Sequence, residues 1–287
     1  MTARGPLTPP ELVEAALAED LGAGDRTSEW SVPEGASGHA RIVARDGGVL
    51  AGSGMAERTF RTLAPGAETA WRVRDGGEVA AGGTVARIEG PLRALLAAER
   101  TALNFLGRLS GIATLTSRFV AAVEGTGCRI TDTRKTTPGW RRLEKAATAA
   151  GGALNHRMGL DDMVLLKENH LRAAGGVAAA LEAVLPRARK AGLAVEVEVS
   201  DRSELEAALA AAPERILLDN MDPAGLRRSV ERARDVPSDE RPLLEASGGV
   251  TLESVRTVAE TGVDLISVGA LTHSAPALDL TMLVEAG

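Results

Sequence analysis

The sequence is poor in aromatic residues, with no Tyr, three Phe and three Trp among 287 residues. Small and aliphatic side chains must therefore fill its core, and Ala alone contributes 50 residues, which suits helices packed closely on a sheet. The hydrophobic fraction of 44% and the charged fraction of 25% exclude a disordered, collagen-like or disulfide-scaffold protein. The length allows two modest domains, or one barrel with an appendage.

Other absences bear on location and partners. The single Cys128 cannot form an intramolecular disulfide, so a reducing cytoplasm is expected. No apolar run reaches the roughly 18 residues of a membrane span, and the first residues lack the apolar region of a signal peptide. The net charge of −6 argues against general nucleic-acid binding. We therefore expect a cytoplasmic protein with no membrane or nucleic-acid partner.

Lysine is also scarce, with four Lys among 33 cationic residues. The segment DGGEVAAGGTVARIEG resembles part of a lipoyl- or biotinyl-carrier sandwich, but such carriers need a Lys and none precedes Lys135. That segment is therefore interpreted as scaffold. Lys135 and Lys167 follow predicted strands, whereas Lys145 and Lys190 are predicted to lie on exposed helix surfaces.

The pattern of elements changes along the chain. The first hundred residues mix helical segments with short strands, and residues 91–123 form a long helical stretch with a stripe of leucines. From residue 129 onward, short apolar runs alternate with helical segments, which is typical of a parallel sheet and, with this many repeats, of a barrel. The expected strands are 129–133, 163–166, 194–199, 215–218, 243–246 and 264–268. A further strand over 155–160 would make seven, and the pattern is compatible with six, seven or eight.

Polar residues and glycines follow these runs, at the strand ends where chemistry collects in such barrels. The residues concerned are Thr133, Arg134, Lys135, Lys167, Glu198, Asp219, Ser247, Gly248, Gly249, Gly269 and Ala270. The glycine-containing ends favour a phosphate ligand, because backbone N–H groups there can approach it closely, although they could also be simple turns. The cations favour an anionic ligand in a chain of negative net charge.

Carboxylates form the third part of this pattern. Alternation along VEVEV places Glu196 and Glu198 on one face of a strand, and an inward carboxylate costs several kcal/mol unless it is paired or functional. They could pair with lysines, stabilise a developing positive charge, or orient Mg²⁺ carried by a phosphate ligand. His39 and His273 are interpreted as surface or core histidines, and the spacing of His and Cys predicts no zinc site.

Five segments together resemble the quinolinate phosphoribosyltransferase family, and the likeness runs from near Glu11 to Leu280. They are TDTRKTTPGWRRLEKAATAAGGALNHRMGLDDMVLLKENH, VEVEV, ILLDNM, EASGGV and GVDLISVGALTHS. The resemblance implies an α/β fold: an N-terminal α/β sandwich domain (1–111), an open seven-stranded TIM-like α/β barrel (112–270), and a C-terminal tail (271–287) that returns to the N-terminal domain. It also implies a homodimer, or a higher oligomer, in which Arg100 of one subunit enters the site of the other.

The activity that the resemblance implies is a decarboxylating pentosyl transfer. Quinolinate and phosphoribosyl pyrophosphate would give nicotinate mononucleotide, pyrophosphate and CO₂ in NAD biosynthesis, without an organic cofactor. Lys135, Lys167, Glu198 and Asp219 would be catalytic, the last two beside the Mg²⁺ that the diphosphate carries. The other substrate-binding residues implied are Arg100, Thr133, Arg134, His156, Arg157, Ser247, Gly248, Gly249, Val268, Gly269 and Ala270.

Three alternatives stay open from the residues themselves. A sibling transferase acting on nicotinate, or the molybdate-operon relative, would share the motifs, although the set of Arg100, Arg134 and Arg157 favours a dicarboxylate. A Schiff-base aldolase would use Lys167 as its nucleophile. A non-catalytic sensor of a phosphate ligand would have no evident need for the acidic pair.

Overall fold

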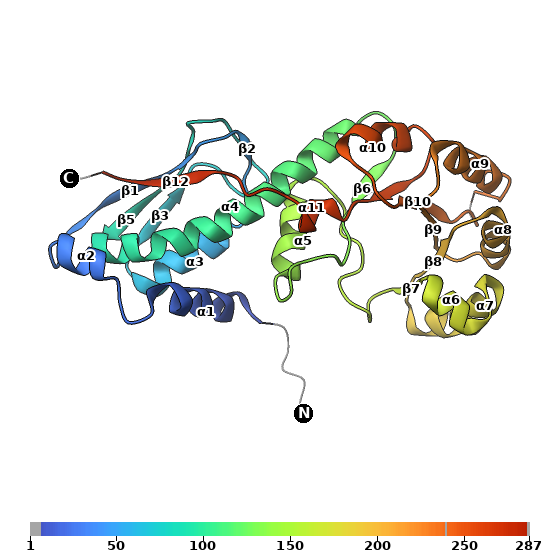
Figure 1. Cartoon of the computed structure of the whole chain (residues 1–287), viewed down its shortest axis with the longest axis horizontal. Coiled ribbons are helices and arrows are strands. Elements are labelled where there is room, and N and C mark those ends of the chain that lie inside the picture. The colour runs from blue at the N-terminus through green and yellow to red at the C-terminus, as the bar shows by residue number, and fades with distance from the viewer. Residues whose placement is uncertain (1–6, 239, 286–287) are drawn as a thin grey trace, which may run out of the picture. The chain divides into compact units, whose positions relative to one another are not determined.

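The computed structural model describes residues 7–238 and 240–285 and divides into two compact units (Figure 1). Unit 1 comprises the residues up to Ser117, Thr137–Gly152 and the residues from Ser274 onward. Unit 2 comprises Arg118–Thr136 and Ala153–His273. Each unit thus draws on separate stretches of the chain, and the division at residues 111 and 270 stays a prediction about domains.

Unit 1 is built on a four-stranded antiparallel sheet with the strand order β12-β1-β5-β3, accompanied by a two-stranded sheet of β2 and β4. Strand β12 pairs antiparallel with β1, with Ala44 opposite Leu280. The predicted return of the C-terminal tail to the N-terminal part is therefore confirmed. The strands are β1 (Ser37–Ala44), β2 (Gly48–Val49), β3 (Glu68–Trp71), β4 (Glu78–Val79), β5 (Thr84–Pro91) and β12 (Leu280–Glu285).

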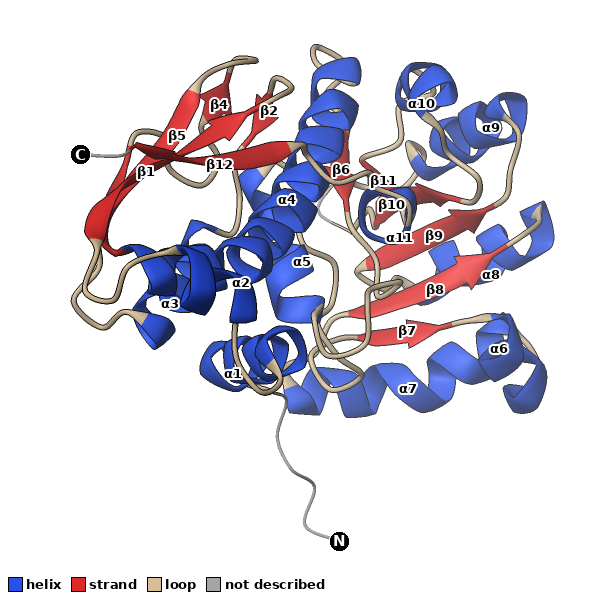
Figure 2. Ribbon diagram, turned by 60° about the vertical axis from the view of Figure 1, so that its left-hand side comes forward, coloured by secondary structure: helices blue, strands red, loops and turns tan. Residues whose placement is uncertain are grey.

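Helices cover one side of this sheet (Figure 2). Phe60 of α3 and Leu95, Leu103 and Leu106 of α4 pack in one core with Ile42 of β1. The leucine stripe expected over 91–123 thus faces the sheet, as helical periodicity requires. The helices are α1 (Pro9–Leu21), α2 (Arg26–Ser31), α3 (Ser53–Leu63), α4 (Leu92–Ala122, in this unit up to Ser117) and α5 (Arg141–Ala150).

Helix α5 corrects one expectation. Lys145 is not on an exposed surface but fully buried, next to the equally buried Glu144. Glu144 accepts hydrogen bonds from the backbone N–H (3.0 Å) and the hydroxyl (2.8 Å) of Thr137, and it pairs with Arg108 at 3.1 Å. The expectation failed because α5 packs into a core formed with other elements, which periodicity within the helix does not reveal.

Unit 2 contains a six-stranded parallel sheet with the order β6-β11-β10-β9-β8-β7, and its helices, apart from the short one at 270–273, lie on the outer side of the strands (Figure 1). Its strands are β6 (Arg129–Thr131), β7 (Val164–Leu166), β8 (Val195–Val199), β9 (Arg215–Asp219), β10 (Leu243–Ser247) and β11 (Leu265–Ser267). Its helices are α6 (Glu168–Ala174), α7 (Val177–Ala191), α8 (Arg202–Ala211), α9 (Pro223–Ala233), α10 (Leu252–Ala259) and α11 (Ala270–His273).

The predicted fold class, a mixed α/β chain with an open α/β barrel, is confirmed. Where a seventh strand was expected over 155–160, the structure has an isolated parallel bridge between Thr131 and Leu154 beside β6. Local signals begin the helices of this unit: the Asp201 carboxylate caps α8, and that of Asp222 caps α9, with Pro223 in its first turn. Strands buried on both faces explain the nearly continuous apolar runs of the sequence.

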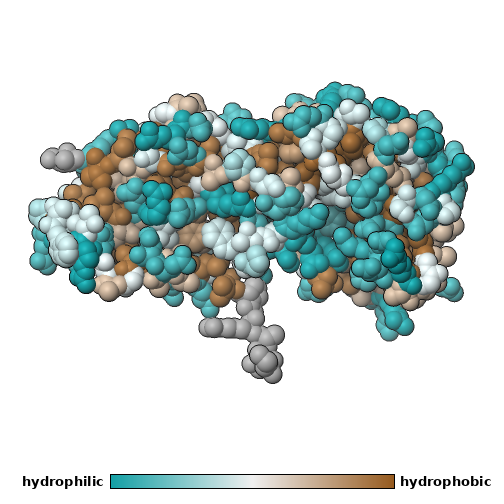
Figure 3. Space-filling view, viewed as in Figure 1, coloured by the Kyte–Doolittle hydropathy of each residue, from teal (hydrophilic) through white to brown (hydrophobic). Residues whose placement is uncertain are grey.

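The surface is mostly polar on the face drawn in Figure 3, where hydrophilic side chains are interspersed with smaller hydrophobic patches. None of the helices in 7–238 and 240–285 is both long enough and apolar enough to cross a membrane.

Gly111 in α4 tests the packing of unit 1. A Cβ at this position would overlap the carbonyl oxygen of Pro276 and lie 2.9 Å from the Cα of Ala277. We expect Gly111→Ala to lower the free energy of unfolding by about 1–3 kcal/mol. Gly54→Ala in α3, where a Cβ would meet nothing within 4 Å, should leave stability unchanged or raise it slightly. Chemical denaturation measures both, and equal losses would contradict the packing explanation.

Candidate active site

A cavity of about 680 Å³ lies at the carboxyl ends of the parallel strands, and every residue that lines it belongs to unit 2. All of the predicted substrate-binding residues line this cavity except Arg100, which is exposed on α4 of unit 1. Strand ends far apart in the sequence thus meet in one place, as the parallel arrangement requires. The predicted residues in its wall are Thr133, Arg134, Lys135, His156, Arg157, Lys167, Glu198, Asp219, Ser247, Gly248, Gly249, Val268, Gly269 and Ala270.

Two arginines supply donors without protein partners. The Nε atoms of Arg134 and Arg157 are buried, and neither has a hydrogen-bond partner among the described residues. Burial, followed by the like charge of Arg134, lowers the pKa of Arg157. Buried donors are normally satisfied, so this pair of guanidinium groups is chemically suited to an anionic ligand.

The two lysines at strand ends have different surroundings. The Lys135 backbone is fixed by its N–H, which donates to Thr133 Oγ1 (3.1 Å), and by its carbonyl, which accepts from Thr272 Oγ1 (2.7 Å). The Lys167 side chain is about half exposed, and its Nζ lies 3.9 Å from Glu198 Oε2. Both lysines can therefore place a point charge in the cavity.

Glu198 and Asp219 bring carboxylates to the same mouth. Glu198 accepts a hydrogen bond from the Glu168 backbone N–H (3.3 Å), and Asp219 Oδ2 accepts one from Asn220 Nδ2 (2.7 Å). These are hard oxygen donors of the kind that Mg²⁺ prefers. The residues present therefore fit a Mg²⁺ ion that arrives with a phosphate ligand.

The glycine-containing end after β10 adopts backbone angles that favour glycine. Gly248 has a φ of 106° and Gly249 a φ of 58°. Asn220, after β9, also has a positive φ, of 52°, and its side chain packs so closely that a Cβ on Gly248 would lie 2.6 Å from Asn220 Cγ. Gly248 therefore packs the end of β10 against Asn220, which hydrogen-bonds Asp219.

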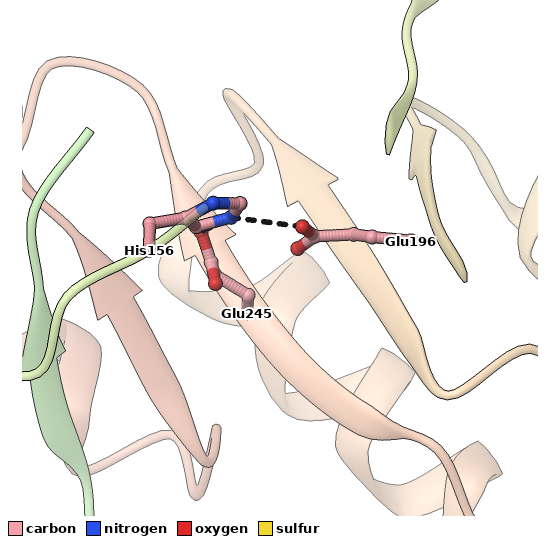
Figure 4. Close-up of side chains that lie close together, drawn as sticks. All are labelled: His156, Glu196 and Glu245. Atoms are coloured by element: carbon pink, nitrogen blue, oxygen red, sulfur yellow. Dashed lines mark ion pairs between the residues drawn. The ribbon is translucent and has the colours of Figure 1, made fainter. Parts of the chain in front are cut away.

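His156, Glu196 and Glu245 form a buried group (Figure 4), and two of them, His156 and Glu245, line the cavity. His156 Nε2 is 2.8 Å from Glu196 Oε2 and 3.7 Å from Glu245 Oε1, and both glutamates are fully buried. Burial, and then the charge of Glu196, raise the pKa of Glu245 to about 7. Burial alone would lower the pKa of His156, but the hydrogen bond to Glu196 and the charge of Glu245 outweigh it, so that the pKa is raised.

Sequence reasoning missed several residues of the wall, among them Asn220, Glu245, Ser267 and His273. Glu245 carried a usable signal, because a carboxylate inside the apolar run LLEA is as unusual as Glu196 inside VEVEV. His273 carried none: it is exposed, as a surface histidine would be, and yet lines the cavity beside Gly269.

Known proteins share the sequence and the fold of this chain. The quinolinate phosphoribosyl transferase models match residues 112–283 (C-terminal domain) and 25–110 (N-terminal domain). The probable nicotinate-nucleotide pyrophosphorylase (carboxylating) of Synechocystis sp. is 44% identical over 274 residues, which are 93% of this chain and 90% of that protein. The enzyme of Mycobacterium leprae named nicotinate-nucleotide pyrophosphorylase (carboxylating) is 44% identical over 273 residues, 94% and 95% of the two chains. The structure of nicotinate-nucleotide pyrophosphorylase from Francisella tularensis superposes with a TM-score of 0.90 at 37% identity and covers 96% of both chains.

Gly248 tests whether the glycines and Asn220 act as one unit. We expect Gly248→Ala to weaken binding of ribose 5-phosphate by about tenfold or more, because overpacking of 1–3 kcal/mol displaces Asn220 or the turn. Gly175→Ala is the matched control: its φ of 88° carries similar backbone strain, but a Cβ there meets nothing within 4 Å. Calorimetric titration should find the affinity of the control within about twofold of the wild type. Equal losses in both variants would contradict the proposed crowding.

Proposed function

Because the chain belongs to the quinolinate phosphoribosyltransferase family, we propose that it joins quinolinate to phosphoribosyl pyrophosphate and releases pyrophosphate and CO₂. The product would be nicotinate mononucleotide, an intermediate of NAD biosynthesis. The observation that carries this proposal is the meeting, in one cavity, of two partner-poor arginines, two carboxylates and two glycine-containing strand ends. These groups match a dicarboxylate, a ribose that develops positive charge, and a phosphate.

The arginines would bind the substrate that carries two carboxylates. A guanidinium matches a carboxylate bidentately, so Arg134 and Arg157 would fix the orientation of the pyridine ring, with Thr133 at the same wall. Such clamps would hold the ring nitrogen toward the ribose C1, and orientation of this kind can supply much of a rate enhancement. The partner subunit's Arg100 would complete the set in a homodimer or higher oligomer.

The carboxylates would act on the ribose. As the bond to pyrophosphate breaks, positive charge develops on the ribose ring, and Glu198 and Asp219 would stabilise it or bind the ribose hydroxyls. The same two residues would hold the Mg²⁺ that accompanies the diphosphate, which neutralises charge on the leaving group when bound. Lys135 and Lys167 line the same cavity and would bind the departing pyrophosphate.

Two substrate groups remain to be placed: the 5′-phosphate of phosphoribosyl pyrophosphate and the 2-carboxylate of quinolinate. The segments Ser247–Gly249 and Val268–Ala270 at the ends of β10 and β11 would bind the 5′-phosphate through backbone N–H groups, except that of Val268, which donates to the Thr131 carbonyl at 3.0 Å. When the 2-carboxylate leaves as CO₂, the electron pair it leaves on C2 is stabilised by the quaternised ring nitrogen until C2 takes up a proton from water. The chemistry therefore requires no organic cofactor. A cytoplasmic location is part of this proposal.

The alternatives fit the site less well. A nicotinate enzyme has one carboxylate to bind, and two cavity arginines with free Nε–H groups exceed that need. Lysine nucleophiles of Schiff-base enzymes are activated by desolvation or a neighbouring cation, whereas Lys167 is half exposed and lies near Glu198. A borohydride-trapped adduct on Lys167 would favour the aldolase over the transferase.

Product analysis tests the proposed reaction directly. With phosphoribosyl pyrophosphate and Mg²⁺, we expect quinolinate to give nicotinate mononucleotide and one CO₂ per turnover, and nicotinate to react at least about a hundredfold more slowly. Arg134→Ala should abolish turnover of quinolinate while the protein stays folded. Equal rates with the two pyridines, or an active Arg134→Ala enzyme, would contradict the dicarboxylate clamp.

Glu198 tests the stabilisation of charge. We expect Glu198→Gln to lower kcat by roughly a hundredfold while the KM for quinolinate changes only a few-fold, because the carboxylate acts on the transition state. Glu206→Gln, which removes an exposed carboxylate that pairs with Arg232 in the outer helices, should leave both constants unchanged. Steady-state kinetics separates the two cases, and an effect of Glu198→Gln confined to KM would argue against this role.

A further inference from the structure

Three polar atoms of His156 contact other residues: its backbone nitrogen and its two ring nitrogens. Its backbone N–H donates to Asp132 Oδ1 at 2.8 Å, and its ring Nδ1 accepts the backbone N–H of Arg157 at 2.8 Å. Its ring Nε2 lies 2.8 Å from Glu196 Oε2 (Figure 4). The side chain is only 6% exposed, so the ring has no freedom to turn without breaking these bonds.

These contacts define where the ring proton lies. A backbone N–H can only donate, so Nδ1 must be unprotonated when it accepts from Arg157. The proton of a neutral imidazole then sits on Nε2, which lies 2.8 Å from Glu196 Oε2. The two glutamates attract a second proton to the ring, but on Nδ1 that proton would face the Arg157 N–H. Both ring nitrogens are thus engaged within the protein.

The hydrogen bond from the Arg157 N–H to His156 Nδ1 lies in a loop. Residues 155–163 lie between the Leu154 bridge and β7 and contain no helix or strand. Arg157 therefore presents its guanidinium to the cavity from a loop, without a neighbouring strand or helical turn to fix its backbone. Its Nη1 donates to the Met163 carbonyl at 3.2 Å, and the bond to His156 fixes its N–H.

Glu196 contacts the other ring nitrogen of His156, Nε2. It lies on β8, in the rigid sheet, and its side chain is fully buried. A buried carboxylate is costly unless it is paired, and His156 is the partner that lies at hydrogen-bond distance. Because its Oε2 lies 2.8 Å from Nε2, Glu196 favours a proton on that nitrogen and leaves Nδ1 free to accept from Arg157.

We propose that Glu196 and His156 are positioning residues that orient Arg157, and that His156 does not itself bind a substrate carboxylate. Glu196 selects the tautomer of His156, His156 fixes the backbone of Arg157, and Arg157 contacts the anionic substrate. Such outer partners commonly change affinity or activity by 10–100-fold when they are removed. This inference rests on the proposed function, because it specifies how that site holds its dicarboxylate.

Two substitutions of His156 separate its two bonds. The amide oxygen of His156→Asn comes near the place of Nδ1 and can still accept from Arg157, whereas the amide nitrogen of His156→Gln comes near the place of Nε2. We expect the KM for quinolinate to stay within about threefold in His156→Asn and to rise about tenfold or more in His156→Gln. The KM for phosphoribosyl pyrophosphate should stay within about twofold in both. If the ring Nε2 bound the substrate directly, the order of the two variants would reverse, and a reversed order or equal losses would overturn the proposal.

A second pair of variants tests Glu196. Glu196→Gln keeps an acceptor for Nε2–H, so the KM for quinolinate should stay within about threefold of the wild type. Glu196→Met removes the acceptor at similar volume and should raise that KM about as much as His156→Gln does. Replacing a buried charge with an apolar side chain is often neutral for stability, so this variant is expected to fold. Unchanged kinetics in a folded Glu196→Met protein would contradict the role of Glu196.

The ring nitrogens can be observed without any variant that risks misfolding. In the full wild-type chain labelled with ¹⁵N-histidine, the His156 spectrum should show a proton on Nε2 and none on Nδ1, before and after saturation with quinolinate. Protonation of Nδ1, or a change of tautomer on binding, would overturn the proposal. If the wild type forms no product from quinolinate, the proposed function fails by itself, and the spectrum of the free protein still decides the hydrogen-bond pattern.

Discussion

Parallel strands that follow one another through helices all end at the same edge of their sheet, and the cavity depends on this constraint. β6 and β11 are neighbours in the sheet although more than a hundred residues separate them in the chain. Their ends therefore bring Arg134 and Gly269 into one wall. The helices on the outer side hold the strands in this order, so each strand end keeps its place while the loops that follow carry the chemistry.

Charge is distributed unequally with depth in unit 2. Arginine and lysine side chains line the cavity with part of their surface exposed, whereas Glu245 of its wall and Glu196 behind it are fully buried. On β8 the same alternation serves two purposes, because Glu196 faces inward among the strands and Glu198, two residues later, reaches the mouth with 16% of its side chain exposed. Glu196 thus acts on His156 within the protein, whereas Glu198 is available to a ligand in the cavity.

Much of this arrangement could be predicted from the sequence, for a physical reason. The apolar runs locate the strands, and a parallel sheet then assigns Thr133, Lys167, Asp219 and Gly248 to one edge. Partners that come from distant elements were beyond prediction: the burial of Lys145 depends on the surroundings of α5, and the contact of Asn220 with Gly248 depends on two strand ends meeting. His156 shows the same limit, because its motif suggested a ligand contact while Glu196 and Arg157 determine what its nitrogens do.

The pairing of β12 with β1 also bears on how the chain is made. The last strand of unit 1 is translated after all of unit 2, so β1 leaves the ribosome more than two hundred residues before its neighbour exists. At a synthesis rate of about 5–20 residues per second, that edge of the sheet stays unpaired for roughly ten seconds or longer. An unpaired edge is a template for pairing with other chains. The nascent protein thus exposes one edge of β1 to other chains until β12 has been made.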